Sequence, residues 1–412
     1  MNTPSSTESS DQPVITEAAF AEPVLVWRNG HVGRITVNRP RALNALTHQM
    51  VRRITEALVA WEHDDAVRAV LVTGAGERGL CAGADIRAIY EDIRSSLRHT
   101  DDGSAGGASG TRGEAAESGE AGLVGEASRA FFRDEYRLNA RIAAYPKPYI
   151  AVMDGITMGG GVGISAHGSV RIVTDRSTVA MPETLIGLMP DVGATYLLSR
   201  APGEIGTHLA LTGASIGAGD AILSGLADHY VPAERIGELI DDLTADADAD
   251  PVHVVRRHAE PTPHGVAAHR PWIDACYAAG PHEDPTGDSV ERIVARLEAD
   301  GRPAAKETAE LISGRSPTAL KVTLRALRTA RRLDSLEAAL QQEYRVSCAC
   351  LSHPDVVEGI RAQIIDKDRR PRWSPPRLDQ VAPADVDRCF APAAGGDLTF
   401  DLNSADGSER SR

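Results

Sequence analysis

Residues 147–161 read Lys147-Pro-Tyr-Ile-Ala-Val-Met-Asp-Gly-Ile-Thr-Met-Gly-Gly-Gly161, and Met181-Pro-Glu183 and Asp191-Val-Gly193 follow them closely. An apolar strand therefore runs into three consecutive glycines. Because glycine has no side chain, backbone N–H groups in such a turn can approach a ligand atom directly. N–H groups at the start of a helix are unpaired and carry partial positive charge, so they suit a developing anion. With Glu183 and Asp191 nearby in sequence, this stretch predicts chemistry on an activated carbonyl.

Composition indicates a globular protein with a sizeable core. The 412 residues are 42% hydrophobic and 25% charged, which is typical of one large or two modest domains. The formal net charge of -14 disfavours nucleic acids and anionic membrane surfaces as partners. No apolar run approaches the ~20 residues that a membrane-spanning helix needs.

Cysteine usage bears on the cellular compartment. An odd and sparse set of five cysteines argues against a disulfide scaffold and favours a reducing cytoplasm. The N-terminal residues 1–12 are polar and acidic, unlike a secretory signal peptide. Histidines 253, 258, 264 and 269 match no compact ligand spacing, so no metal site is predicted. The sequence thus predicts a cytoplasmic protein.

Strand and helix signals alternate along the first half of the chain. Apolar segments flank Asn29-Gly30, a pair that is typical of a tight β-hairpin. Short apolar runs predict buried strands at 69–73, 149–153 and 171–174, and helical spacing predicts helices at 47–62 and 127–144. This alternation predicts an α/β fold with helices packed on sheets.

Changes in composition suggest four regions. Residues 1–20, rich in Ser, Thr and Glu, predict a disordered tail. The core is predicted at 21–230, with a Gly-, Ala-, Ser- and Glu-rich flexible insertion at about 101–125. Residues 231–380 are predicted to form a helical C-terminal region, and residues 381–412 a loose tail.

An ordered set of motifs resembles the enoyl-CoA hydratase/isomerase (crotonase) superfamily. The set comprises Asn38–Asn44, Gly74-Ala-Gly76 leading to Cys81–Ile86, Met158–Gly161 and Met181–Glu183. The resemblance implies a crotonase-like spiral of repeated ββα units followed by a helical C-terminal region. In relatives that region caps the active site or mediates trimer contacts, so a homo-oligomer remains open.

A narrower resemblance is to the 3-hydroxyisobutyryl-CoA hydrolase subgroup. The segments that carry it are Phe131–Tyr136, Gly155–Gly163, Met181–Gly193, Ser316–Leu324, Glu343–Ser347, Glu358–Arg361 and Asp366–Trp373. The resemblance implies hydrolysis of a short 3-hydroxyacyl-CoA thioester, above all 3-hydroxyisobutyryl-CoA to 3-hydroxyisobutyrate and CoA in valine breakdown. It implies no separate cofactor, because coenzyme A is part of the acyl-CoA substrate.

The resemblance also assigns backbone roles around the glycine turns. It implies that the N–H groups of Ala84 and Gly160 form an oxyanion hole for the thioester oxygen. It implies that Ala82, Asp85 and Ile86 bind the coenzyme A moiety. For Asp85 an alternative is equally open, namely that its side chain caps the helix that follows.

Three carboxylates receive substrate roles from the same resemblance. Glu183 would attack the thioester carbonyl or activate a water against it, and the sequence does not separate the two. Asp191 would bind the substrate hydroxyl and assist acid–base steps; the alternative is a turn-forming aspartate. Glu135 would contact substrate, along with Gly160, Glu183 and Asp191; the alternative is a solvated glutamate on a helix face.

Gly163 is a departure that separates two activities. Hydratases of this superfamily add water with two glutamates, and Gly163 stands at the position of the first. A hydrolase needs an oxyanion hole and one carboxylate, so the departure favours hydrolysis. An enoyl-CoA hydratase or isomerase remains the alternative, and a non-catalytic CoA-thioester binder or RNA-binding relative is a third hypothesis.

Overall fold

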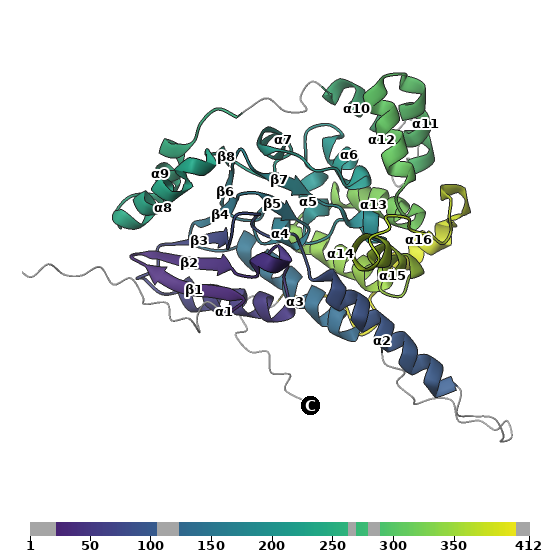
Figure 1. Ribbon diagram of the computed structural model, residues 1–412, viewed down its shortest axis with the longest axis horizontal. Helices are drawn as coiled ribbons and strands as arrows, with labels where there is room; N and C mark the ends of the chain where they lie inside the picture. The colour runs from purple at the N-terminus through teal and green to yellow at the C-terminus, as the bar shows by residue number, and fades with distance from the viewer. Residues whose placement is uncertain (1–21, 105–122, 263–268, 279–288, 401–412) are drawn as a thin grey trace, which may run out of the picture.

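Two β-sheets form the centre of the protein, and helices surround them (Figure 1). The computed structural model describes residues 22–104, 123–262, 269–278 and 289–400. A six-stranded sheet has the order β1-β2-β3-β4-β6-β8, and a small sheet pairs β5 with β7. The strands are β1 Val24–Asn29, β2 Val32–Val37, β3 Ala69–Gly74, β4 Tyr149–Met153, β5 Ile156–Met158, β6 Val170–Val173, β7 Thr178–Ala180 and β8 His229–Tyr230.

The predicted hairpin is confirmed at the edge of the large sheet. β1 pairs antiparallel with β2 in a register that sets Val24 opposite Val37. Gly30 in the turn has φ +59°, a left-handed conformation that glycine adopts without steric cost. All other neighbouring strands in both sheets run parallel. Parallel strands need crossover connections, so helices cover both faces.

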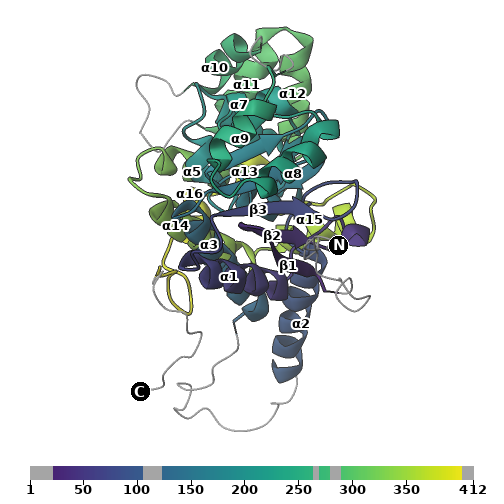
Figure 2. The ribbon, with the colours of Figure 1, turned by 90° about the vertical axis from the view of Figure 1, so that its left-hand side faces the viewer.

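Alternating side chains of the buried strands supply two separate cores. On β3, Val70 and Val72 join the core that includes α1 His48–Glu62 and α3 Glu126–Ala143. Leu71, between them, joins the core with α8 Ile236–Ala245 and α9 Pro251–His258. Figure 2 shows α1 on one side of the sheet and α8 and α9 on the other. The apolar β3 run, with no polar face, is what such a doubly covered strand requires.

Successive turns of the chain repeat one pattern, and this repetition is the spiral. A strand of the large sheet is followed by a short extended segment, and then by a helix or helical turn. The extended segments pair with one another through the bridges Leu46↔Ala84, Cys81↔Thr157 and Val179↔Ile216 and through β5–β7. The structure thus confirms the crotonase-like α/β fold that the motifs predicted.

Side-chain caps begin two of the helices. Thr47 Oγ1 accepts a hydrogen bond from Met50 N at 3.3 Å where α1 begins. Ser316 Oγ accepts one from Ala319 N at 3.1 Å ahead of Pro317.

The other helices are α2 Ile86–Ser104, α4 Gly160–Gly163, α5 Ala194–Leu198, α6 Ile205–Thr212, α7 Ala218–Leu223, α10 Arg270–Tyr277, α11 Val290–Asp300, α12 Pro303–Ser313, α13 Pro317–Ala330, α14 Leu336–Cys350, α15 Pro354–Ile360 and α16 Pro383–Cys389.

The C-terminal helices divide into two groups (Figure 1). Helices α10, α11 and α12 share a small core with α6 and α13. Helices α14 and α15 pack on the main core beside the spiral. Within the described residues, no helix is both long enough and apolar enough to cross a membrane.

Two of the predicted boundaries need comment. Helix α2 continues to Ser104, so the start of the predicted insertion is helical, while 105–122 and the predicted tail 1–20 lie outside the described residues. The expectation of a loose tail is wrong for residues 381–400. Val386 on α16 and Leu398 are buried, and Asp397 forms an ion pair with Arg345 at 2.6 Å. Sparse apolar residues, rather than a continuous apolar pattern, dock this segment.

The contact between α15 and the turn that begins at Glu183 can be tested with a glycine. A methyl group added to Gly359 would lie 2.5 Å from Ile186 Cα. We expect Gly359→Ala to lower the free energy of unfolding by roughly 1–3 kcal/mol, because the two backbones must separate. Urea unfolding measures this value.

A matched control exists on α8. A methyl group added to Gly237 meets nothing within 4 Å. Gly237→Ala should therefore leave stability unchanged or raise it by up to about 1 kcal/mol. Equal destabilisation by both substitutions would contradict the close α15 contact.

Candidate active site

Two successive turns of the spiral each carry an unpaired backbone N–H group, and the two turns lie close together. Leu46 bonds to the residues on either side of Ala84, because Leu46 N donates to Gly83 O and Asp85 N donates to Leu46 O, both at 2.8 Å. In a parallel ladder this alternation turns the Ala84 N–H away from Leu46. Gly160 begins α4, so its N–H has no partner inside the helix. Among the described residues, neither N–H has an acceptor.

Glycine makes the approach of these two turns possible. Gly83 has φ +107° and Gly159 has φ +49°, conformations that other residues rarely adopt. A methyl group added to Gly83 would lie 3.2 Å from Met158 O and 3.6 Å from Gly160 N. One added to Gly160 would lie 3.4 Å from Ala84 N. The structure therefore brings the predicted pair Ala84 and Gly160 together.

Glu183 enters the same place from the following turn of the spiral. It begins a 3₁₀ turn, Glu183–Ile186, directly after β7 and Pro182. Its side chain is buried, and a methyl group on Gly159 would lie 2.9 Å from its Oε1. Its Oε2 is a buried oxygen without a hydrogen-bond partner among the described residues. Burial, and then the nearby charge of Asp191, raise the pKa of Glu183 well above its ordinary value.

Glu135 comes from α3, far from the glycine turns in sequence. The side chain is 1% exposed, so the alternative of a solvated helix-face glutamate is wrong. A methyl group added to Gly160 would overlap Glu135 Oε1, which places this carboxyl beside the Gly160 turn. Oε1 also lacks a partner within the described part of the chain. Burial first, and Asp191 second, raise the pKa of Glu135.

Asp191 is held by a hydroxyl. Tyr136 Oη donates to Asp191 Oδ2 at 2.6 Å and lies 2.8 Å from Ser347 Oγ. Burial raises the pKa of Asp191 to about 6, and the hydrogen bond from Tyr136 opposes that rise. Because the three carboxyls titrate as an interacting group, this hydrogen bond favours placing a negative charge on Asp191 first.

The turn that carries Asp191 is fixed by two further side chains. Val192 has φ +54°, which is costly for a β-branched residue. His167 Nε2 donates to Val192 O at 2.7 Å, and burial lowers the pKa of His167 to about 4. Glu343 Oε2 accepts from Gly193 N at 2.6 Å. These contacts hold a strained turn in one conformation and orient Asp191.

A cavity of about 280 Å³ unites these groups. Its lining is mostly apolar, from the side chains Ile86, Ile89, Phe132, Leu185, Ile186, Leu188, Val192 and Ile364. The polar lining comprises Glu135, Glu183, Asp191 and Gln363 together with the Gly83–Ala84 and Gly159–Gly160 turns. Apolar walls with a few convergent polar groups are typical of small-molecule sites.

The three residues expected to bind coenzyme A differ in whether they line the cavity. Ala82 and Ile86 line the cavity. Asp85 does not line it; its carboxylate forms an ion pair with Arg39 at 3.0 Å. The Asp85 carbonyl accepts from the N–H groups of Ala88 and Ile89, where α2 begins. The side chain of Asp85 therefore braces the Arg39 loop against the start of α2.

Gly163 lies where a larger side chain does not fit. A methyl group there would be 2.8 Å from Asn139 Nδ2 and 2.8 Å from Val192 Cβ. The carboxylates that reach the cavity come instead from α3, through Glu135, and from the Asp191 turn.

Several residues of the site were not predicted. Phe132 and Gln363 line the cavity, and Tyr136 and Glu343 hold Asp191 and its turn. All four lie inside or next to segments that carried the narrower family resemblance. The signal was therefore present, but only the folded chain shows which of these side chains face the cavity.

The assembled geometry defines a class of chemistry. Two N–H groups without an acceptor among the described residues lie beside three buried carboxyls in one largely apolar cavity. Such N–H groups stabilise an oxyanion that develops on a carbonyl. A carboxyl with a raised pKa is a stronger base and accepts a proton near neutral pH.

Comparison with known proteins agrees with this class. The sequence pattern described as enoyl-CoA hydratase/isomerase matches residues 32–390. The chain therefore belongs to the enoyl-CoA hydratase/isomerase family, as its motifs predicted.

The most similar curated relatives include proteins named "3-hydroxyisobutyryl-CoA hydrolase, mitochondrial". The protein from Danio rerio is 40% identical over 386 residues, with 91% of each chain covered. The protein from Gallus gallus is 39% identical over 387 residues, covering 92% of this chain and 91% of the relative. The protein from Homo sapiens is 37% identical over 389 residues, with 92% and 91% covered.

Two solved structures share the fold across most of this chain. The crystal structure of a carnitinyl-CoA dehydratase from Mycobacterium thermoresistibile is 50% identical, with a TM-score of 0.79, covering 92% of this chain and 99% of that one. The structure of an enoyl-CoA hydratase from Rhodobacter sphaeroides 2.4.1 is 38% identical, with a TM-score of 0.78, covering 92% and 100%.

Glu135 is buried, and its Oε1 has no hydrogen-bond partner among the described residues. This environment predicts how stability depends on pH. Because its pKa is higher folded than unfolded, the folded state holds an extra proton above pH 4.5, and stability is lost as pH rises. We expect Glu135→Gln to reduce that loss between pH 5 and pH 7 by up to about 1.4 kcal/mol per pH unit. Urea unfolding across this range provides the measurement.

Glu56→Gln is the control, because Glu56 is an exposed glutamate on α1. This variant should keep the wild-type dependence of stability on pH. A Glu135→Gln protein with the wild-type pH dependence would show that Glu135 is not the buried, protonated group described.

Proposed function

We propose that this protein hydrolyses 3-hydroxyisobutyryl-CoA to 3-hydroxyisobutyrate and CoA, a step of valine breakdown. The proposal rests on one observation: Glu135, Glu183 and Asp191 converge beside two unpaired N–H groups in a single cavity. The names of the curated relatives support it. No separate cofactor enters the proposed reaction, because coenzyme A arrives as part of the substrate.

The oxyanion hole supplies the largest single contribution. The N–H groups of Ala84 and Gly160 would donate to the thioester oxygen as negative charge develops on it. Removing one such donor in enzymes typically costs about a hundredfold or more in rate. Because the donors are backbone groups held by the glycine turns, they need no reorganisation during the reaction.

Glu183 would act on the thioester carbon by one of two routes. As a nucleophile, its carboxylate bonds to the carbonyl carbon, the C–S bond breaks, the CoA thiolate leaves and takes a proton, and water then hydrolyses the anhydride. As a general base, it takes a proton from water while the water oxygen bonds to the carbonyl carbon; the tetrahedral intermediate then collapses, the C–S bond breaks, and the leaving CoA thiolate takes the proton back from Glu183. Both routes end in the free acid and CoA, and both need the ionised form of Glu183.

The substrate hydroxyl distinguishes the proposed substrate from simple acyl thioesters. Asp191, ionised above about pH 6, would accept a hydrogen bond from that hydroxyl, and Glu135 would contact it from α3. A buried polar group left unpaired is costly, so a substrate without the hydroxyl should bind poorly in the transition state.

An enoyl-CoA hydratase or isomerase is the second candidate. The two solved structures are named as a carnitinyl-CoA dehydratase and an enoyl-CoA hydratase, and they support it. Against hydration by a glutamate pair stands Gly163, where Asn139 and Val192 leave no space for a glutamate.

Location and assembly belong to the proposal as well. A cytoplasmic location was expected from the cysteines, and the described cysteines are all free thiols. The curated relatives carry "mitochondrial" in their names, and reduced thiols suit either compartment. Cell fractionation distinguishes the two compartments, and light scattering tests the homo-oligomer left open by the family resemblance.

The proposed reaction is tested by thiol release from a panel of thioesters. We expect rapid release from 3-hydroxyisobutyryl-CoA and 3-hydroxypropionyl-CoA, and slow release from isobutyryl-CoA, which lacks the hydroxyl. Glu183→Gln should lower kcat by roughly a hundredfold or more, because the neutral amide is neither base nor nucleophile. Glu56→Gln, on the exposed face of α1, should retain full activity.

Two results would contradict this reaction. Equal rates with isobutyryl-CoA would remove the role given to the hydroxyl. Loss of crotonyl-CoA absorbance without thiol release from any thioester would assign the protein to the second candidate.

The hydrogen bond from Tyr136 predicts the pH profile. If ionised Asp191 binds the hydroxyl, its protonation should contribute an acidic limb of kcat/KM near pH 6, at lower pH than the limb that protonation of Glu183 sets. Tyr136→Phe removes the donor that opposes the rise in the pKa of Asp191, so this acidic limb should move to higher pH. The profile of kcat/KM between pH 5 and pH 9 measures the shift.

Tyr145→Phe is the matched control, since this hydroxyl donates to Leu58 O at 2.9 Å and does not line the cavity. Its acidic limb should stay in place. A limb unmoved in Tyr136→Phe would mean that Asp191 does not set it.

A further inference from the structure

The segment Asp366–Arg372 lies next to the part of the cavity wall that comes from the C-terminal region. Helix α15 ends in a π-helical turn, Arg361–Ile365, and two residues of that turn, Gln363 and Ile364, line the cavity. The segment then folds back, and Arg369 N donates to Ala362 O at 3.0 Å. Its backbone is therefore held against the turn that forms the wall.

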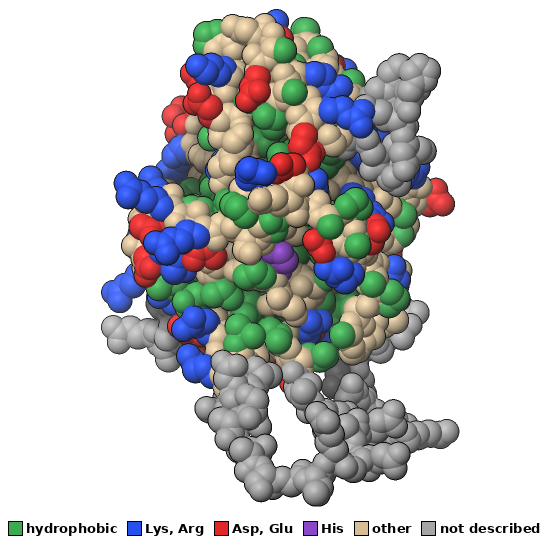
Figure 3. Space-filling model, turned by 90° about the vertical axis from the view of Figure 1, so that its right-hand side faces the viewer, with side chains coloured by type: hydrophobic (Ala, Val, Ile, Leu, Met, Phe, Trp, Pro, Cys, Tyr) green, Lys and Arg blue, Asp and Glu red, His purple; other side chains and the backbone are tan. Residues whose placement is uncertain are grey.

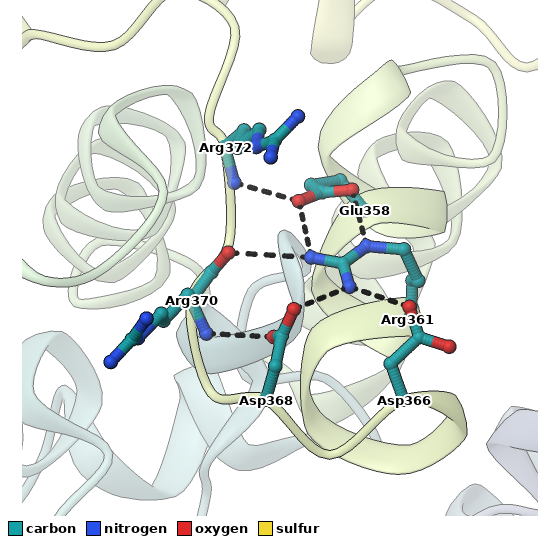
Figure 4. Close-up of polar contacts among 6 residues, drawn as sticks. All are labelled: Glu358, Arg361, Asp366, Asp368, Arg370 and Arg372. Atoms are coloured by element: carbon teal, nitrogen blue, oxygen red, sulfur yellow. Dashed lines mark hydrogen bonds and ion pairs between the residues drawn. The ribbon is translucent and has the colours of Figure 1, made fainter.

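All three guanidinium nitrogens of Arg361 donate hydrogen bonds, and these bonds hold this segment in place (Figure 4). It donates to both oxygens of Glu358 at 2.8 Å, and to Asp366 Oδ2 and Asp368 Oδ2 at 2.7 Å. It also donates to the carbonyl of Arg370 at 3.3 Å. Figure 4 shows the side chains of Arg370 and Arg372 directed away from this cluster.

Four cations of the segment are exposed and do not take part in the cluster through their side chains. They are Lys367, Arg369, Arg370 and Arg372. Among the described residues, none of the four forms an ion pair. The neighbouring Arg361, by contrast, forms ion pairs with three carboxylates. In a chain of net charge -14, a run of unpaired cations is a local reversal of sign. Figure 3 shows Lys and Arg side chains interspersed with Asp and Glu side chains along one margin of the face on the α15–α16 side.

The backbone of the segment is held in a conformation that side chains oppose. Lys367 has φ +59° and Arg369 has φ +56°, and neither is glycine. Such residues cost free energy and persist only where the surroundings enforce them. Here the Arg361 cluster enforces them, so the backbone from which two of the cations project is held in one conformation.

We propose that Lys367, Arg369, Arg370 and Arg372 form a subsite for the phosphate groups of the coenzyme A substrate at the mouth of the acyl cavity. This inference rests on the proposed function, which supplies a thioester of coenzyme A. A cavity of about 280 Å³ holds the acyl group and the thioester end of the coenzyme, so the nucleotide with its phosphates lies outside it. Phosphates pair well with guanidinium groups, which donate in a fixed fork.

The test compares two substrates that differ in their phosphates. The first is 3-hydroxyisobutyryl-CoA, and the second is S-(3-hydroxyisobutyryl)pantetheine, which has the same thioester but no phosphate. For the double variant Lys367→Gln with Arg369→Gln, KM for the CoA thioester should rise roughly three- to tenfold. KM for the pantetheine thioester and both kcat values should stay as in the wild type. Salt should raise the wild-type KM only for the CoA thioester.

A charge-matched control removes two exposed cations elsewhere. Arg256 lies on α9 and Lys306 on α12, both away from α15 (Figure 1). The double variant Arg256→Gln with Lys306→Gln should keep the wild-type KM for both substrates. A rise in KM for the CoA thioester equal to that of the first variant would reduce the effect to net charge and overturn the subsite.

Other outcomes also decide the matter. Unchanged KM values in the first variant would overturn the proposal. An equal rise for both thioesters would do the same, because the segment would then shape the acyl cavity rather than bind phosphate. If the wild type releases no thiol at all, the proposed function fails, and calorimetric titration with CoA and with pantetheine tests the subsite by itself. Weaker binding of CoA alone in the first variant would then still support it.

Discussion

The close approach of two glycine turns is the constraint on which the rest of this structure depends. Gly83 and Gly159 adopt positive φ, and added methyl groups on Gly83 and Gly160 would meet the backbone of the opposite turn. This approach brings Ala84 and Gly160, whose N–H groups have no acceptor among the described residues, to the lining of one cavity. The spiral supplies the two turns in equivalent places, each at the end of an extended segment and the start of a helix. The repeat of the fold is therefore also the origin of the paired donors.

Burial of three carboxyls in one place makes their ionisation costly, and the surrounding residues offset this cost unequally. Desolvation raises the pKa values of Glu135, Glu183 and Asp191, and each charge opposes ionisation of its neighbours. The hydroxyl of Tyr136 lowers this cost at Asp191 alone. Glu135 Oε1 and Glu183 Oε2 keep no partner within the described residues, and both belong to residues that line the cavity. Their unused hydrogen-bonding capacity is available to a substrate.

The C-terminal region completes what the spiral begins. Gly359 on α15 sits against Ile186 in the turn that Glu183 begins, and Gly187 lies against the backbone of Asp355. Glu343 on α14 holds the Asp191 turn through Gly193 N. The π-helical turn after α15 then adds Gln363 and Ile364 to the wall. Because these helices contact the turns that carry Glu183 and Asp191 and also form part of the cavity wall, the shape of the cavity depends on how that region docks.

Features that depend only on neighbouring residues could be predicted from the amino-acid sequence. The hairpin at Asn29-Gly30, the caps Thr47 and Ser316, the buried strands and the glycine turns all follow local rules of turn chemistry, capping and apolar patterning. The convergence of distant segments could be seen only in the folded chain. Tyr136 and Ser347 lie 211 positions apart, and Gly193 and Glu343 lie 150 apart, so no local pattern could pair them. Burial of Glu135, the ion pair of Asp85 and the docking of residues 381–400 are likewise properties of packing, because the same residue types are solvated in the unfolded chain.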